Sequence, residues 1–135
     1  MLSIALSLTL WMATTCATAG ELTENRVRAY YAAWSSGNVN EVMTFYTPDV
    51  AYEDVATGEL AKGAAEVRGF AVKFLEGSPG VKVEPTSVLI GERFAAIEWT
   101  MGAGTGKDAW TVRGVAILEH RDGQIARATD YWDCK

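Results

Sequence analysis

The sequence predicts an α+β domain in which three helices cover one face of a curved, mostly antiparallel sheet. Apolar residues in the first half recur at the three- and four-residue spacing that is typical of helices. The second half contains four apolar runs separated by short turn sequences, a pattern typical of a strand meander. A strongly curved sheet covered in this way encloses a cone, and the mouth of a cone is a natural pocket for a small molecule.

The first two helices have recognisable caps. Thr23 can cap a helix that runs to about residue 36, and Gly37 ends it. Asn38, with an acid three residues later, predicts the cap of a second, short helix that ends at residues 48–49. The apolar face of the first helix is formed by Val27, Tyr30, Tyr31 and Trp34.

A third helix and five strands account for the remainder of the chain. Residues 50–52 predict a short strand, and Gly63 opens a helix over residues 64–75. The connections at residues 91–92 and 121–123 are short enough for antiparallel hairpins. The four strands of the predicted meander are residues 81–90, 94–101, 110–119 and 125–132.

The first nineteen residues resemble a secretory signal peptide. Residues 2–12 are apolar and uncharged, and Ala17-Thr18-Ala19 is a small-x-small cleavage site, although no Lys or Arg precedes the apolar run. The run is too short to span a membrane. The sequence therefore predicts a domain over residues 20–135 that is secreted or periplasmic, with no membrane association after cleavage.

Charge and motifs argue against several partners. Lys and Arg number 12 against 17 Asp and Glu, and the basic residues are scattered singly, so nucleic acid is a poor candidate partner. His120 is the only histidine, and no metal site is predicted. The glycine-rich run at residues 102–106 has no helix start and no Lys-Ser/Thr ending, so it is not a phosphate loop, and no cofactor is expected.

Asp54 stands where a strand should enter the core. Tyr52 and Asp54 share one side of that strand, and Glu53 points to the other. If the first side faces the cone, desolvation raises the pKa of Asp54 and makes it a better base, and a hydroxyl of Tyr30 or Tyr31 could donate to an enolate oxygen. Asp54 could instead cap the loop at residues 55–59 through backbone amides.

Residues 30–70 resemble the first half of the NTF2-like superfamily, and the closest similarity is to ketosteroid isomerases and SnoaL-like polyketide cyclases. Tyr30 matches the oxyanion tyrosine, Asp54 matches the base, and Gly37, Gly63 and Phe70 follow the same pattern without a gap. Residues 114–133 resemble the terminal hairpin of SnoaL-like domains. The resemblance implies a pocket for a small hydrophobic, carbonyl-bearing ligand and a homodimer formed through the outer sheet face.

Two departures from the isomerase pattern concern acids. The isomerases carry a second, protonated acid at the position that matches Gly114 or Val115, and this chain has none there. Asp130 shares one face of the last strand with Trp132, and the SnoaL-like resemblance places that face in the pocket. Asp54 and Asp130 could then serve as one base and one acid.

Each site residue also has a structural interpretation. Asp130 could pair with Arg127 or Arg113, and Tyr30 could be a core aromatic. The sequence does not separate core from pocket lining for the remaining candidates, which are Trp34, Phe70, Phe74, Trp99 and Trp132. The sequence therefore supports two hypotheses: a cofactor-free isomerase or cyclase acting next to a carbonyl, and a non-catalytic ligand-binding or assembly module of the same fold.

Overall fold

The computed structural model describes residues 20–133. The predicted signal peptide, residues 1–19, lies outside the described residues. Along the described chain the elements are α1 (Glu24–Ser36), α2 (Val39–Met43), β1 (Tyr46–Asp54), β2 (Glu59–Lys62), α3 (Ala64–Gly77), β3 (Lys82–Ile90), β4 (Phe94–Ala103), a 3-10 turn (Gly106–Asp108), β5 (Trp110–Arg121) and β6 (Gln124–Trp132).

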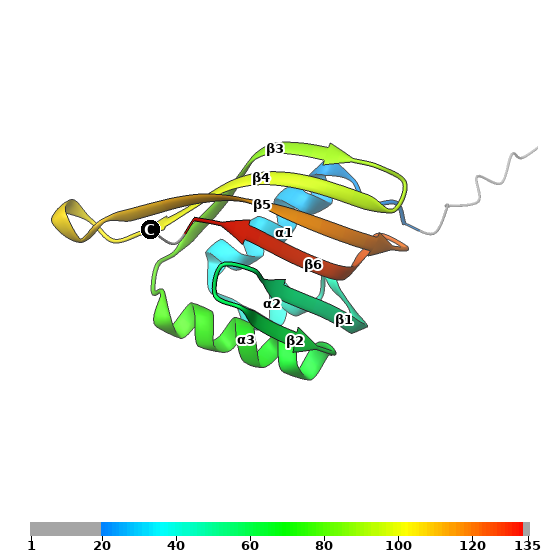
Figure 1. Ribbon diagram of the computed structural model, residues 1–135, viewed down its shortest axis with the longest axis horizontal. Coiled ribbons are helices and arrows are strands. Elements are labelled where there is room, and N and C mark those ends of the chain that lie inside the picture. The colour runs from blue at the N-terminus through cyan, green and yellow to red at the C-terminus, as the bar shows by residue number, and fades with distance from the viewer. Residues whose placement is uncertain (1–19, 134–135) are drawn as a thin grey trace, which may run out of the picture.

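One six-stranded sheet in the order β2-β1-β6-β5-β4-β3 organises the domain. Every neighbouring pair is antiparallel except β1 and β6, which run parallel. The helices lie on the same side of the twisted sheet and leave its other face uncovered (Figure 1). The predicted α+β cone, with a mostly antiparallel sheet around three helices, is confirmed.

The predicted caps form as the sequence indicates. The Thr23 side chain accepts a hydrogen bond from the Arg26 amide, and the Asn38 side chain accepts from the amides of Asn40 and Glu41. Gly37 ends α1 with a φ of 75°, a left-handed conformation that glycine adopts without strain. These local signals set where the aromatic face of α1 begins and ends.

Two details of the predicted boundaries are wrong. The second helix ends at Met43, and β1 begins at Tyr46, because the Tyr46 side chain is buried against α1. Pro48 is tolerated in β1 because no pair with β6 forms between Tyr46 and Ala51, where the register shifts. The four-residue strand β2 was not predicted, because it is too short to show a period.

The core lies between the helices and the inner face of the sheet. Val27 on α1, Ile97 on β4, Leu118 on β5 and Ile125 on β6 are all almost completely buried there. The inward positions of β4 alternate with outward ones, so Trp99 is buried while its neighbour Glu98 is exposed. This alternation determines which side chains reach the interior of the cone.

Candidate functional site

A cavity of about 530 Å³ lies inside the cone. Its wall is formed by α1, α3 and the inner face of the sheet, so residues far apart in the sequence meet there. All eight residues singled out in the sequence line this one cavity: Tyr30, Asp54, Asp130, Trp34, Phe70, Phe74, Trp99 and Trp132. Tyr31, Tyr52, Met101, Trp110 and Val112 extend the mainly apolar lining.

The helices supply an aromatic wall. Trp34 of α1 packs edge-on against Phe74 of α3 with ring centroids 5.6 Å apart. Phe70 lies one helical turn before Phe74 and contacts the Tyr52 ring of β1 at 4.4 Å between centroids. Such packing fixes the rings and gives the cavity a defined apolar shape.

Asp54 and Asp130 lie side by side on the sheet. They are register partners on the parallel strands β1 and β6, and both line the cavity. Asp130 Oδ2 accepts a hydrogen bond from the Tyr52 hydroxyl at 2.5 Å, and its Oδ1 accepts one from Trp99 Nε1 at 3.1 Å. Tyr52 was not predicted as a site residue, although strand alternation places its side chain on the same side of β1 as that of Asp54.

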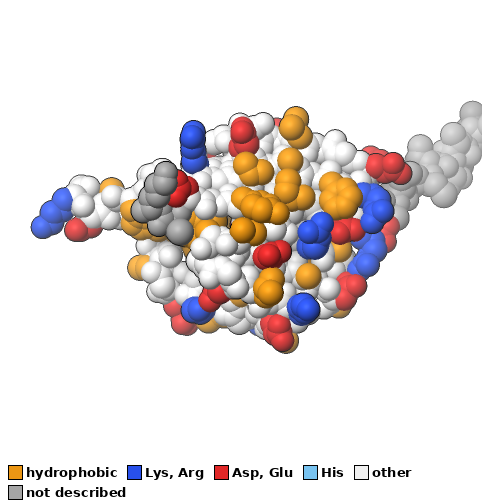
Figure 2. Space-filling model, viewed as in Figure 1, with side chains coloured by type: hydrophobic (Ala, Val, Ile, Leu, Met, Phe, Trp, Pro, Cys, Tyr) orange, Lys and Arg blue, Asp and Glu red, His pale blue; other side chains and the backbone are white. Residues whose placement is uncertain are grey.

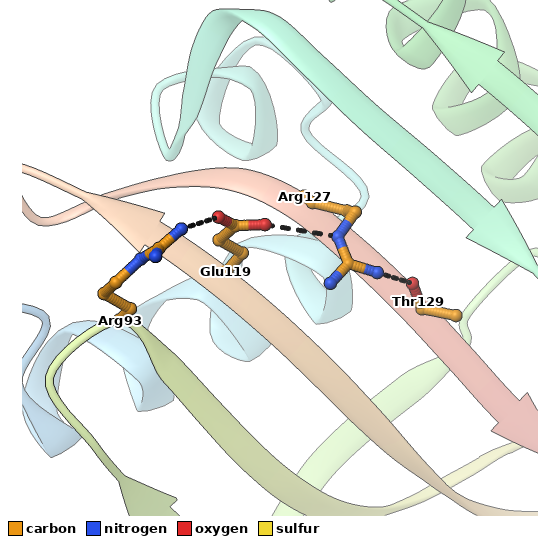
Figure 3. A network of polar contacts seen from close by, with 4 residues as sticks. All are labelled: Arg93, Glu119, Arg127 and Thr129. Carbon is orange, nitrogen blue, oxygen red and sulfur yellow. Dashed lines mark hydrogen bonds and ion pairs between the residues drawn. The ribbon is translucent and has the colours of Figure 1, made fainter.

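Asp130 has no arginine partner of the kind considered from the sequence. Arg127, whose side chain points to the outer face, bonds to Glu119 and Thr129 instead, and Glu119 also bonds to Arg93 (Figure 3). The pKa of Asp130 is raised to about 6. Burial is the main cause of the rise, the hydrogen bonds from Tyr52 and Trp99 oppose it, and the negative charge of Asp54 adds to it. The pKa of Asp130 is therefore closer to neutral pH than that of an ordinary aspartate.

Asp54 lines the cavity and also caps the loop that follows β1. Its Oδ1 accepts hydrogen bonds from the Thr57 amide at 3.1 Å and from Trp132 Nε1 at 2.9 Å. The first bond is the loop cap that the sequence offered as an alternative. The residue Asp54 is 8% exposed, less than Asp130, which is half-buried.

A pair of tyrosines forms a second polar feature. The hydroxyls of Tyr30 and Tyr46 are 2.6 Å apart and both are buried. Burial raises the pKa of Tyr30 well above its usual range, so the phenol is neutral at all ordinary pH values. If Tyr46 donates to Tyr30, the proton of Tyr30 is free for a ligand oxygen. Tyr46 was missed because the sequence placed it at a helix end.

The position of the absent isomerase acid has a structural explanation. Trp99, Gly114 and Trp132 form one row across β4, β5 and β6. A Cβ atom at Gly114 would lie 2.5 Å from a carbon of the Trp99 ring and 2.8 Å from Trp132 Cβ. The two tryptophans therefore fill the space that an acid would need, and each donates its indole N–H to one aspartate of the cavity.

Within residues 20–133, no group of three or more His, Cys, Asp or Glu side chains is placed to hold a metal ion. None of the helices in that same range combines the length and the apolar character needed to cross a membrane.

The fold and the cavity define a class of small conical domains that enclose a ligand-sized space. The chain belongs to the SnoaL-like domain family, whose profile matches residues 27–128, and through it to the NTF2-like superfamily. A comparison with curated protein sequences finds no match.

Several solved structures share the fold. A hypothetical protein with a ketosteroid isomerase-like fold from Catenulispora acidiphila, solved with trimethylamine, is 24% identical, with a TM-score of 0.76 over 83% of this chain and 88% of that one. A provisionally assigned ketosteroid isomerase from Kribbella flavida is 26% identical, with a TM-score of 0.66 over 82% of this chain and 77% of that one. A provisionally assigned polyketide cyclase from Sinorhizobium meliloti is 18% identical, with a TM-score of 0.66 over 81% and 95%.

Proposed function

We propose that the protein binds a small hydrophobic carbonyl compound in the cavity and catalyses proton transfer next to the carbonyl group, as a cofactor-free isomerase or cyclase. The observation that carries this proposal is Asp130, an acid with a pKa of about 6 that lines an aromatic cavity. A base with a pKa near the working pH is the most effective proton acceptor, because it is both ionised and basic.

We assign the base to Asp130 rather than to Asp54. Each acid accepts two hydrogen bonds, but Asp130 is the less buried of the two residues and its pKa is raised, whereas Asp54 is buried and caps the loop through the Thr57 amide. In the proposed step an Asp130 carboxylate oxygen takes a proton from the carbon next to the carbonyl. The electron pair of the broken C–H bond moves to the carbonyl oxygen as an enolate forms, and Asp130 then returns the proton to carbon.

The enolate oxygen needs a hydrogen-bond donor. Tyr30 is suited to this role because it is neutral, lines the cavity and can receive a hydrogen bond from Tyr46 while donating its own proton. Aligned donors of this kind stabilise charge that develops in the transition state. Asp54 then acts mainly on Asp130, since its negative charge helps to raise the Asp130 pKa.

Hydrogen exchange at the ligand tests the proposal without knowledge of the natural substrate. A panel of hydrophobic ketones is incubated with the protein in deuterated water, and deuterium at the carbon next to the carbonyl is followed by NMR. We expect uptake with the wild type, a loss of at least about a hundredfold in Asp130→Asn and a clear loss in Tyr30→Phe. Glu53→Gln is the matched control, because Glu53 is exposed on the opposite side of β1.

Equal exchange in the wild type and in Asp130→Asn would refute the assignment of the base. The second candidate, a binding module without catalysis, is favoured by the two hydrogen bonds that already occupy Asp54 Oδ1. It predicts ketones that bind, as shown by calorimetry, and no deuterium uptake with any member of the panel.

We also propose a homodimer formed through the uncovered face of the sheet. Hydrophobic side chains gather on that face (Figure 2), and among them Leu89 and Phe94 are exposed beside half-buried Ile117. The Arg93–Glu119–Arg127 network borders them. Light scattering should give the mass of a dimer for the wild type and of a monomer for Ile117→Asp, and a monomeric wild type would contradict this.

Export remains a proposal that follows from the sequence alone. Cleavage after Ala19 would leave a protein that begins at Gly20. Mass spectrometry of the protein from its own host should find this N-terminus, and an intact Met1 would overturn the proposal.

A further inference from the structure

We propose that the natural ligand carries a positive charge: the cavity is built for a hydrophobic amine whose ammonium group lies between the carboxylates of Asp54 and Asp130. This inference rests on the proposed function, since it names the class of compound that the same cavity takes. It concerns the charge of the ligand, whereas the reaction proposed above concerns the carbonyl.

The ionisable groups of the cavity are unbalanced. Asp54 and Asp130 are side by side at the sheet, and the donors that reach them are neutral: the Thr57 amide, the Tyr52 hydroxyl and the indoles of Trp99 and Trp132. Two adjacent carboxylates in an apolar space are unfavourable without a counter-charge. A cation between them would remove that cost.

The cationic side chain in the cavity wall, Lys73, already has an acidic partner. Lys73 is the one Lys or Arg side chain among the described lining residues, and it pairs with Glu59, which also lines the cavity. The Lys73 side chain is 74% exposed, so it lies on the solvent side of the cavity, and its ion pair is with Glu59 rather than with the aspartates. The lining therefore keeps a net negative charge at the two aspartates, where a ligand ammonium could be received.

The rest of the lining suits a weakly hydrated cation. Aromatic rings close to an ammonium group attract it through their negative faces. The cavity has rings on several sides, with Trp34 and Phe74 on the helices and Trp99 and Trp132 on the sheet. Tertiary and secondary amines expose apolar substituents that such walls accept, so the ligand need not be highly polar.

A positive charge would act on the proposed reaction in two opposing ways. It would lower the pKa of Asp130 and so weaken the base, and it would stabilise the negative charge of the enolate. The enolate oxygen develops negative charge in the cavity that the aspartates line, and its donor Tyr30 is neutral. An ammonium group on the same ligand would offset the repulsion between the enolate and the aspartates, an attraction that strengthens as the surroundings become less polar. An aminoketone would therefore combine both features.

Ionisation of the facing groups makes the binding depend on pH. Asp130 gains its charge as the pH rises through about 6. Tyr30, Tyr31 and Tyr52 also face this space, and burial raises the pKa of each well above its usual range, so they stay neutral. Affinity for an amine should rise from pH 5 to pH 8, and affinity for a neutral compound should not.

Three probes with one carbon skeleton test the inference: 4-phenylbutan-2-amine, 4-phenylbutan-2-ol and 4-phenylbutan-2-one. Their dissociation constants are measured by calorimetry at pH 5 and pH 8 with the intact protein. At pH 8 we expect the amine to bind about tenfold or more tightly than the alcohol, as a charge–charge contact in a partly buried site should allow. The preference should shrink at pH 5 and in Asp130→Asn, and remain in Glu53→Gln.

An alcohol that binds as tightly as the amine at pH 8 would overturn the inference, and so would an amine preference that Asp130→Asn leaves intact. The ketone separates this failure from that of the reaction. Deuterium uptake by the ketone without an amine preference would support the proposed function alone. An amine preference without uptake would support the charged-ligand inference alone, and no binding by any probe would overturn both.

Discussion

A methyl group at Gly114 should damage the site more than its size suggests. The Cβ atom of Gly114→Ala would lie 2.5 Å from the Trp99 ring, 2.5 Å from the Tyr131 carbonyl oxygen and 2.8 Å from Trp132 Cβ. The carbonyl belongs to the neighbouring strand and cannot move without disturbing the sheet. Overpacking of this kind typically costs about 1–3 kcal/mol.

The displacement should also reach the aspartates. Trp99 and Trp132 donate to Asp130 and Asp54, so shifting either indole weakens a hydrogen bond at the floor of the cavity. We expect Gly114→Ala to lose stability in urea unfolding followed by circular dichroism and to weaken binding of the phenylbutyl probes.

Gly69→Ala is the matched control. Gly69 lies within α3, its added Cβ would meet nothing within 4 Å, and it is exposed. Alanine in a helix is favoured over glycine by up to about 1 kcal/mol, so this variant should be as stable as the wild type or more stable. A Gly114→Ala protein that matches Gly69→Ala in stability and the wild type in ligand affinity would refute the packing argument.

Three further predictions concern the acid, the tyrosine pair and a cap. The folded-state pKa of Asp130 is raised from 3.8 to about 6, so its stabilising contribution is complete below pH 3.8 and is lost as the pH rises through 6. The full loss is up to about 3 kcal/mol. The stability of Asp130→Asn relative to the wild type should therefore improve from pH 3.5 to pH 7.5 in urea unfolding, and a constant difference would contradict this. Tyr46→Phe should slow deuterium uptake by the ketone several-fold, with little change in its dissociation constant, because Tyr30 loses its donor while the wall is unchanged; unaltered uptake would exclude that role. Asn38→Ala should cost about 1 kcal/mol in thermal unfolding, because two amides at the start of α2 lose their acceptor, and unchanged stability would show that the cap contributes nothing.

The sequence predicted the fold where local signals are strong. Thr23, Gly37 and Asn38 mark helix ends through hydrogen bonds and backbone conformations that depend on a few neighbouring residues. The strands of the meander can be recognised in the sequence because alternating apolar residues and tight turns repeat along the chain. The parallel contact of β1 with β6 joins residues about eighty positions apart, and no local pattern encodes it.

The residues of the site could be predicted from the sequence, but most of the contacts between them could not. Strand alternation indicated that Asp54 and Asp130 could face inward, and helix spacing did the same for Trp34 and Phe70. The hydrogen bond from Tyr52 to Asp130 depends on the register between β1 and β6, and the contact of Tyr46 with Tyr30 depends on where α2 ends. Such contacts between distant segments decide which acid is suited to accept a proton.

The proton affinity of Asp130 is the quantity on which the reaction and the charged-ligand inference both depend. It can be measured directly by following the carboxyl carbon of Asp130 by ¹³C NMR during a pH titration of the wild type and of Asp54→Asn. We expect a midpoint near pH 6 in the wild type and a lower midpoint in Asp54→Asn, because the neighbouring negative charge is removed. A midpoint near 4 that the Asp54 substitution leaves unchanged would contradict this expectation.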